Sequence, residues 1–445
     1  MFFSMNVFAL APAILPSMAG LSARQLVALK TPLAETAKRQ GFACEAGNFG
    51  LTAQEFDLYA DIADAGADYR HFYALRFRIP YQPLETAQLD SNPQPLVTIC
   101  SDIEIRVFDE MIAIATLEAR LALSAEHDFA NSPGKLDALI VTTISRACKD
   151  ALCRVDQCIQ LTKDVVHPKG VLKKDLMSPQ GLDQPSIGWV HKVFLPNEES
   201  LHHLSDRSDF AQALVAPLTL KEFMPDTDYF GWGDSIKISD HSLPNNRSQS
   251  WRDGCVISQY YYFALDRFNR RVPELIFKLR SSVETDSLTM TRTLGMDLRH
   301  RVAEKDIAYA DFLHGVAGDC RLPVESYDVR WRFADLRRNL ASKLPILQDV
   351  LNEVQELSQR RTNATVETLL SIFSIFGLIS LLLSSHDYVA KSPTDKVGTE
   401  DVLMATFSGI HDILSVSVWL ALFFLFIVTY IRFGIRQRVM RWFKR

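Results

Sequence analysis

Two long runs without a charged residue lie near the C-terminus, and they constrain the fold more than any other feature of this chain. They cover Thr368–Ser385 and Ile413–Ile431, which are 18 and 19 residues long. A helix needs about 20 mostly apolar residues to cross the hydrocarbon layer of a bilayer. We therefore expect a hairpin of two transmembrane helices behind a large water-soluble part. For the first run, which contains several serines, a buried core helix is the alternative.

Basic residues flank the expected hairpin at both of its outer ends. Arg360 and Arg361 precede the first run, and six Arg or Lys residues follow the second, from Arg432 to Arg445. The connecting segment 386–412 has two lysines against five carboxylates. Since cytoplasmic flanks carry the excess of Lys and Arg, both termini are predicted in the cytoplasm and the acidic loop outside. The predicted location is a bacterial inner membrane.

The rest of the chain has the composition of a globular protein. Hydrophobic residues make up 47% and charged residues 23% of the 445 residues, which excludes general disorder. The net charge of −5 creates no field that favours direct binding of nucleic acid. Seven cysteines without a CxxC pair indicate buried, reduced thiols rather than disulfides or a zinc finger.

The pattern of apolar residues upstream of the hairpin predicts an α+β cytosolic part. Met1–Ala23 is expected to form a strand and a turn, because a signal peptide would have a basic start. Alternation predicts a strand over Phe72–Ile79 and an antiparallel hairpin around Asp109-Glu110. A long helix is expected to begin at Ser132-Pro133, with this apolar face: Leu136, Leu139, Ile140, Ile144, Ala147 and Ala151. A shorter helix is expected over Ala53–Tyr69.

A long helical stalk is predicted before the first apolar run. Its apolar residues recur at spacings of three and four: Phe333, Leu336, Leu340, Leu344, Leu347, Leu351 and Val354. This spacing is typical of a heptad seam, and neither Pro nor Gly follows Pro345 before the run. We expect one helix that enters the membrane without interruption. The alternative is an ordinary amphipathic helix packed on its own subunit.

These patterns divide the chain into four predicted segments. They are an N-terminal α/β domain (1–165), a linker with a second β-containing segment (166–250), a helical region with the stalk (251–366), and the transmembrane hairpin with its basic tail (367–445). Glycines 231 and 233 alternate with aromatic residues in the second segment. They indicate either core packing at a strand or a platform on which a ligand stacks.

The two apolar runs differ in character. The second has large apolar groups on every side, as a lipid-facing helix does. The first has a small or hydroxyl residue about every three positions, which either allows close helix packing or lines a narrow wet path. Two helices cannot enclose a pore, so conduction requires several subunits around an axis. Candidate pore and gate residues are Ser371, Ser374, Gly377, Leu378, Leu381, Leu382 and Ser384, and candidate outer-mouth residues are Ser385, His386 and Asp387.

The segment Gln359–Asn363, followed by Val366–Leu383, resembles the place where stalk becomes pore helix in the CorA-like two-span superfamily. The resemblance covers the C-terminal quarter of the chain. It implies a homopentameric funnel whose first span lines an ion path gated by the cytosolic domain. Magnesium transporters of this superfamily end that span with Gly-Met-Asn, whereas this chain has Ser384–Asp387 there. Several CorA-like proteins without the signature look like type III CRISPR-associated effectors of antiviral defence, in which a nucleotide messenger triggers membrane disruption.

Two further groups of residues are candidate regulatory sites. Four aspartates fall on one helical face and are suited to a divalent cation such as magnesium, with a solvated acidic face as the alternative: Asp57, Asp61, Asp64 and Asp68. Five arginines near aromatic residues are suited to the phosphates and base of a nucleotide, with salt bridges as the alternative: Arg267, Arg270, Arg271, Arg337 and Arg338. Neither group implies a firmly bound cofactor.

The sequence contains no GxSxG, HExxH, Walker or GxGxxG motif, so we do not expect an enzyme. The expected function is a homo-oligomeric, pentameric CorA-like channel or transporter that passes cations, divalent ions included. Its expected partners are the lipid bilayer and further copies of itself. The alternatives are a defence effector activated by a nucleotide messenger, which permeabilises the inner membrane, and a membrane-anchored scaffold that conducts nothing.

Overall fold

The computed structural model describes residues 2–19, 21, 23–46, 74–81, 97–124, 133–166, 183–196, 228–237, 245–282, 288–316 and 318–390. These residues form a mixed α+β fold with seven α-helices and one sheet. The chain divides into two compact units, Met1–Gln359 and Arg360–Arg445. The predicted segments 1–165 and 166–250 are thus parts of one unit, and each unit is described below by itself.

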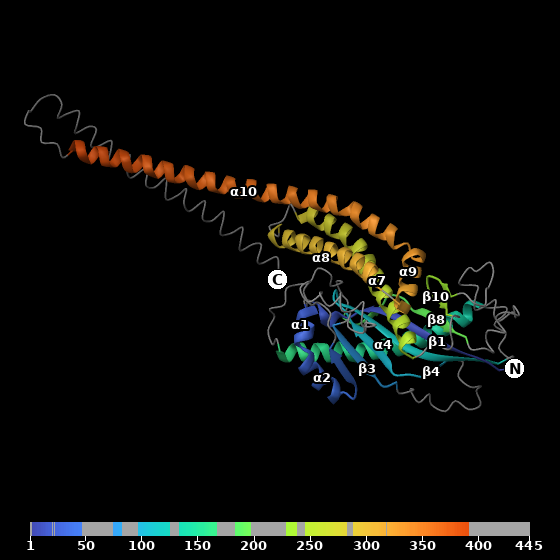
Figure 1. Ribbon diagram of the computed structural model, residues 1–445. Coiled ribbons are helices and arrows are strands. Elements are labelled where there is room, and N and C mark those ends of the chain that lie inside the picture. The colour runs from blue at the N-terminus through green and yellow to red at the C-terminus, as the bar shows by residue number, and fades with distance from the viewer. Residues whose placement is uncertain are drawn as a thin grey trace, which may run out of the picture. The chain divides into compact units, whose positions relative to one another are not determined.

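The sheet of the first unit has ten strands in the order β2-β3-β5-β6-β1-β8-β10-β9, with β4 paired to β6 and β7 to β1 (Figure 1). Its strands are β1 (Phe2–Ile14), β2 (Ala43–Ala46), β3 (Leu75–Ile79), β4 (Val97–Ile99), β5 (Ile103–Val107), β6 (Ile112–Ser124), β7 (Ser186–Ile187), β8 (His191–Leu195), β9 (Tyr229–Phe230) and β10 (Asp234–Ile236). The pairing of β10 with β8 is parallel, and the other pairings are antiparallel.

The N-terminal strand lies in the middle of this sheet. β1 pairs along its whole length with β6, from Phe2↔Ser124 to Ile14↔Ile112, and with β8 on its other side. Successive residues of a strand face opposite sides of the sheet, and both Ala9 and Leu10 are fully buried. Burial on both faces explains why this segment contains no charged residue. The observed strand, followed by the short helix η1 (Pro16–Met18), confirms the prediction of a strand and a turn.

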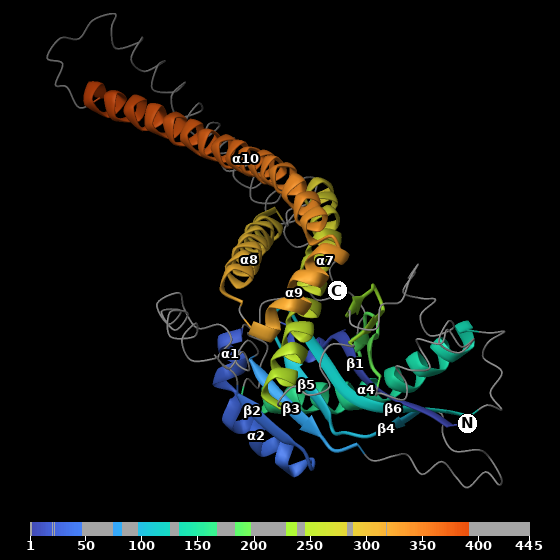
Figure 2. The same ribbon diagram turned by 45° about the vertical axis from the view of Figure 1, so that its right-hand side comes forward.

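Helices cover both faces of the sheet. Adjacent residues of β8 identify them: Lys192 pairs with Asp137 of α4 (Pro133–Val166), while His191 bonds Tyr327 of α9 (Arg321–Arg330). α7 (Asn245–Ser282) lies on the His191 face, where Phe263 contacts the β1–β8 region at Gly188. Figure 2 shows α7 and α4 on opposite sides of the strands. The short helices α1 (Ala23–Ala28), α2 (Lys30–Arg39) and η1 (Pro16–Met18) accompany α4, which packs on α2 and η1.

The predicted stalk seam packs within its own chain. α10 (Phe333–Ala390) begins beside α7 and α8 (Leu288–Gly315), and Phe333 stacks on Tyr309 of α8 at 4.9 Å. The remaining seam residues to Val354 are buried or half-buried in the same core. The structure therefore agrees with the alternative of an amphipathic helix packed on its own subunit. As predicted, α10 continues into the apolar run without interruption, with Pro345 inside it.

One local prediction was wrong, and one is only partly described. Pro273 lies inside α7, and the Asn269 carbonyl that it deprives of a helical partner accepts a hydrogen bond from Lys343 of α10 at 3.0 Å. Leu139 was placed on the buried face of α4 but is exposed. The predicted strand Phe72–Ile79 is described from Leu75, and the predicted helix Ala53–Tyr69 lies outside the described residues.

Candidate functional site

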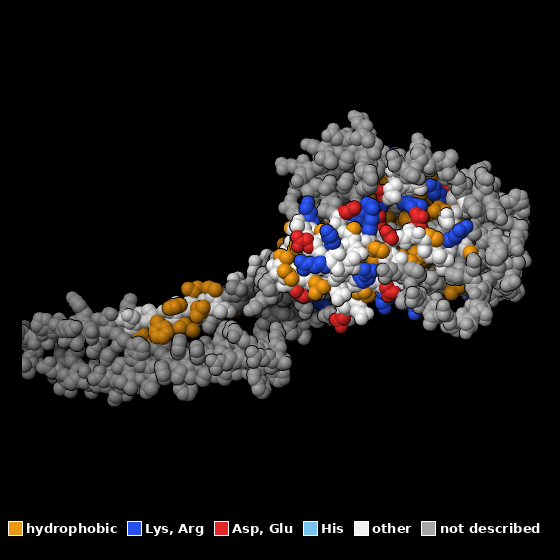
Figure 3. Space-filling view, turned by 90° about the horizontal axis from the view of Figure 1, so that it is seen from below, with side chains coloured by type: hydrophobic (Ala, Val, Ile, Leu, Met, Phe, Trp, Pro, Cys, Tyr) orange, Lys and Arg blue, Asp and Glu red, His pale blue; other side chains and the backbone are white. Residues whose placement is uncertain are grey.

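The second unit contains a helical segment that is long and apolar enough to cross a membrane. It covers Asn363–Ser380 of α10, five residues upstream of the predicted Thr368–Ser385, and none of it is buried. Leu370, for example, is 60% exposed. Hydrophobic side chains gather along this part of the helix in Figure 3. By length and composition, an apolar helix that is uncovered among the described residues is suited to contact lipid or further protein.

Hydroxyl groups within this segment find partners on their own helix. Thr368 Oγ1 donates to the Ala364 carbonyl at 2.7 Å, and Ser371 Oγ donates to the Glu367 carbonyl at 2.8 Å. A hydroxyl bonded four residues back needs no water, so it is tolerated in an apolar environment. These residues are compatible with a bilayer as well as with a wet path.

The predicted pore residues all lie on α10. Ser371, Ser374, Gly377 and Leu378 are exposed in this single chain. Ser371, Ser374 and Leu378 share one face, since they are three and four residues apart. The remaining candidates lie on the last turns of α10, where the side chains are outside the described residues: Leu381, Leu382, Ser384, Ser385, His386 and Asp387.

Several predictions fall on parts of the chain that the structure does not describe. The predicted connecting segment 386–412 begins inside α10, which continues to Ala390, so a loop was wrongly expected for residues 386–390. The rest of that segment, the second apolar run and the basic tail lie outside the described residues. The same holds for the four aspartates of the predicted metal site: Asp57, Asp61, Asp64 and Asp68. Within the described ranges, no group of three His, Cys, Asp or Glu side chains is arranged to hold a metal ion.

The five arginines predicted to bind a ligand each contact an oxygen of their own chain. Arg267 donates to the backbone carbonyl of Glu110. The other four pair with carboxylates: Arg270 with Asp266, Arg271 with Glu274, Arg337 with Asp306, and Arg338 with Asp335. Arg337 also lies against the ring of Tyr309, at 5.7 Å from its centroid. Their partners lie on different elements, namely the turn after β5, α7, α8 and α10.

A buried chain of charges, which sequence patterns did not indicate, joins the two strands β3 and β5 to α7. Glu104 of β5 lies between Arg76 of β3 and Arg106, at 2.5 and 2.6 Å. Arg106 continues the chain to Asp253 of α7 at 2.6 Å. Burial alone would raise the pKa of Glu104, but Arg106 and Arg76 outweigh it and lower the pKa. Alternating charges of this kind hold strand and helix in one register.

A second buried polar group surrounds His191 of β8. Its Nδ1 lies 3.4 Å from the Trp232 carbonyl, which can only accept, so Nδ1 must carry the proton. Nε2 is then an acceptor for the Tyr327 hydroxyl, 2.7 Å away, and Ser235 Oγ lies 3.1 Å from both Nε2 and that hydroxyl. Burial lowers the pKa of His191 to about 3, which keeps the ring neutral.

The aromatic-glycine segment contributes to this same region. Trp331 donates from Nε1 to the Gly231 carbonyl at 2.9 Å, and its ring contacts Trp232, Tyr262 and Phe333. Most of these rings are buried or half-buried, while Trp232 is 54% exposed. The rings pack on one another, while the segment's own aromatic residues stay half-buried at Tyr229 and Phe230 and exposed at Trp232.

All seven cysteines are free, and four of them are buried: Cys148, Cys158, Cys255 and Cys320. Burial raises the pKa of the Cys148 thiol to about 12, which makes it unreactive. The prediction of buried, reduced thiols holds for these four, whereas Cys100 is exposed.

Comparisons of this chain with protein-family models, with curated proteins and with solved structures return no match.

Proposed function

We propose that this chain is a CorA-like, homo-oligomeric membrane channel or transporter, which passes cations under the control of its cytosolic part. The observation that carries the proposal is the uncovered apolar segment Asn363–Ser380. It continues a helix whose first half belongs to the core of a soluble unit. A soluble protein would bury such a segment, and a simple membrane anchor would not need to continue a core helix of a folded domain.

Conduction requires several copies of α10 around an axis, because one or two helices cannot enclose a path. In the closed state, Leu378 and the following Leu381 and Leu382 form an apolar ring that water leaves, which blocks hydrated ions. A shift of the cytosolic part that moves α10 widens this ring. The magnesium ion is a candidate cargo, since CorA-like proteins pass divalent cations, although Gly-Met-Asn is absent here.

The second spanning helix, from Ile413 to Ile431, completes the proposed hairpin in a bacterial inner membrane. With it, the flanking basic residues keep both termini in the cytoplasm. The alternative of a nucleotide-activated effector has less support, because the arginines expected to hold a nucleotide bond oxygens of their own chain.

Ion flux from vesicles that contain the purified full-length chain tests the proposal. Release of a trapped divalent cation is compared with protein-free vesicles, with and without external magnesium and with and without added nucleotides. Leu378→Ser is expected to raise the unstimulated flux several-fold, because a hydroxyl keeps the narrow ring wet. The matched control is Leu369→Ser, on the opposite side of the same helix, which is expected to leave flux unchanged.

Flux indistinguishable from protein-free vesicles, for the natural chain and for both variants, would reject a channel. The result would then favour a membrane-anchored scaffold. Flux that appears only with a nucleotide, regardless of magnesium, would favour the defence effector.

A further inference from the structure

The turn between β5 and β6 has a backbone conformation that residues other than glycine rarely adopt. Glu110 has a φ of 56° and Met111 a φ of 63°, both in the left-handed region. Two-residue hairpin turns of this geometry usually contain Asn-Gly, because glycine has no Cβ to clash. Two consecutive non-glycine residues remain in this conformation only where the surroundings hold them there.

Lys305 of α8 and Tyr260 of α7 hold the first residue of the turn. Lys305 Nζ lies 2.5 Å from Asp109 Oδ2 and 2.5 Å from the Tyr260 hydroxyl. That hydroxyl donates in turn to Asp109 Oδ1. Lys305 and Tyr260 are both buried, so their bonds to Asp109 are shielded from water. Tyr260 also stacks on Phe108, the residue before the turn, at 4.3 Å.

Two arginines hold the second residue of the turn. Arg267 of α7 donates to the Glu110 carbonyl, and Arg301 of α8 lies 3.2 Å from the Glu110 carboxylate. The Glu110 side chain is itself nearly buried. The turn is thus bonded on both of its polar residues to both α7 and α8.

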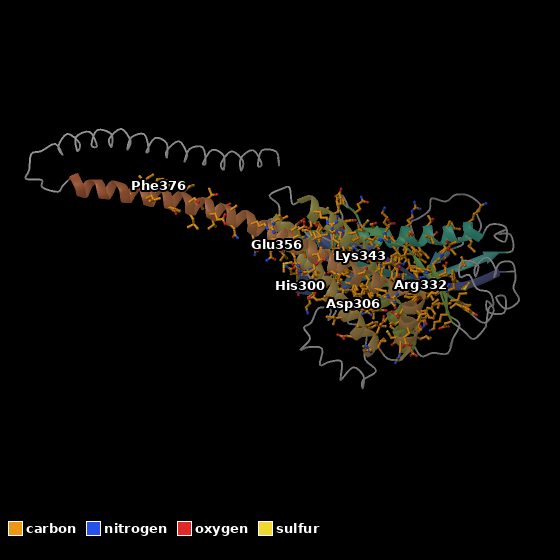
Figure 4. All side chains as sticks on the ribbon, turned by 90° about the horizontal axis from the view of Figure 1, so that it is seen from above. His300, Asp306, Arg332, Lys343, Glu356 and Phe376 are labelled. Atoms are coloured by element: carbon orange, nitrogen blue, oxygen red, sulfur yellow. The ribbon has the colours of Figure 1, made fainter. Side chains whose placement is uncertain are left out.

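The same stretch of α8 also bonds α10. Asp306, the neighbour of Lys305 in sequence, accepts from Arg337 of α10 at 2.5 Å. Two more contacts between α8 and α10 lie on either side of this pair. Tyr309 of α8 stacks on Phe333 of α10, and Arg299 of α8 bonds Gln348 of α10 at 2.5 Å. Figure 4 shows Asp306 and His300 on α8, and Lys343 and Glu356 on α10. Adjacent residues of one rigid helix therefore connect the sheet to α10.

We propose that the Asp109–Met111 turn is a latch that fixes α8 on the sheet and thereby fixes the first half of α10. When Lys305 leaves Asp109, the left-handed turn relaxes and α8 moves together with α10. The consequence of this latch for gating rests on the proposed channel function, whereas the mechanical connection does not.

Hydrogen–deuterium exchange of the full-length chain in lipid nanodiscs tests the latch. Lys305→Met keeps the apolar stem and removes the charge. It is expected to speed exchange about tenfold in the turn, in α8 and in residues 340–354 of α10, while α4 stays unchanged. Arg338→Met is the matched control, since it removes an exposed ion pair within α10 alone and is expected to change nothing.

Asp109→Asn provides a second variant of equal size, should Lys305→Met fail to fold. It is expected to produce the same pattern of exchange with a smaller increase. Faster exchange confined to the turn, with α8 and α10 as protected as in the natural chain, would overturn the proposal.

The same variant separates the latch from the channel. In vesicles, Lys305→Met is expected to raise cation flux, because it loosens the attachment of α10 through α8 while the Lys343–Asn269 bond to α7 remains. If no variant conducts while exchange spreads to α8 and α10, the latch stands and the channel proposal fails.

Discussion

Arg106 of β5 and Asp253 of α7 lie 2.6 Å apart, with side chains that are only 4% and 3% exposed. The guanidinium also bonds Glu104 through Nε at 2.6 Å. A charge this deeply buried is tolerated only when it is paired and hydrogen-bonded. The pair therefore decides where α7, and with it the helical layer, lies on the sheet.

Removing one member of this pair is expected to cost more than removing both. Asp253→Leu leaves the Arg106 guanidinium without its α7 partner and is expected to lower the free energy of unfolding by about 3–5 kcal/mol. The double variant Arg106→Met, Asp253→Leu is expected to be more stable than Asp253→Leu alone. Chemical denaturation followed by circular dichroism measures both. If the double variant were less stable than both the natural chain and Asp253→Leu, the two charges would stabilise the fold on balance.

His191 predicts a loss of stability at acidic pH. Its pKa is about 3 in the folded chain, below the ordinary value of 6.5 that applies to the unfolded chain. As the pH falls, the unfolded state therefore binds the proton before the folded state does. The stabilisation of the folded chain by neutral His191 is complete above pH 6.5 and is lost as the pH falls toward 3. The slope reaches about 1.4 kcal/mol per pH unit for a single proton.

His191→Gln serves as the comparison, because glutamine keeps a donor and an acceptor but does not titrate. The natural chain is expected to lose stability more steeply than this variant between pH 6.5 and 4.5, as measured by the midpoint of denaturation. Parallel curves would contradict a neutral, buried histidine.

Substitution of alanine for glycine is expected to change the stability in opposite directions at two helical positions, Gly254 and Gly134. A Cβ at Gly254 of α7 would lie 2.6 Å from the Cys320 carbonyl and 2.7 Å from Pro323 Cγ, so the two segments must move apart. Gly254→Ala is expected to destabilise the chain by about 1–3 kcal/mol. Gly134→Ala in α4 meets nothing within 4 Å and is expected to be neutral or to stabilise by up to about 1 kcal/mol. Thermal unfolding of both variants checks this, and equal melting temperatures would refute the close approach.

A comparison of arginine substitutions at two exposed apolar residues tests whether the candidate span contacts lipid or water. Leu370 in the candidate span is 60% exposed, and Val329 of α9 is 78% exposed. Arginine in the middle of a spanning helix costs about 2.5–3.5 kcal/mol of insertion energy, whereas arginine on a wet surface costs little. Leu370→Arg is therefore expected to move protein from the membrane fraction to the soluble or aggregated fraction, and Val329→Arg is not. Equal partitioning of the two variants would remove the case for a bilayer.

Features that depend on local pattern could be predicted from the sequence. The hairpin at Asp109-Glu110, the helix that starts at Pro133 and the long helix through Pro345 all follow from spacing along a few turns or strands. The apolar segment of α10 was likewise predicted, because its composition is independent of its neighbours.

Features that depend on distant partners could not be predicted. A seam at spacings of three and four has the same pattern whether it packs on its own chain or on another copy, so the partners of Leu347 and Leu351 were undetermined. Arg106 and Asp253 lie far apart in sequence, and nothing in either neighbourhood indicates their pairing. One local signal did exist for the supposed ligand-binding arginines: Asp266 precedes Arg270 by four residues, which is the spacing of a helical ion pair.

Labelling of introduced cysteines with a membrane-impermeant maleimide tests whether α10 leads the chain from the cytoplasm into the bilayer. In a Cys44→Ser, Cys100→Ser, Cys153→Ser background, which keeps only the four buried cysteines, Glu356→Cys, Phe373→Cys and Thr394→Cys are compared in sealed vesicles of either orientation. The account predicts labelling of position 356 only from the cytoplasmic side, of position 394 only from the opposite side, and of position 373 from neither. Labelling of position 373 from the same side and at the same rate as position 356 would contradict it.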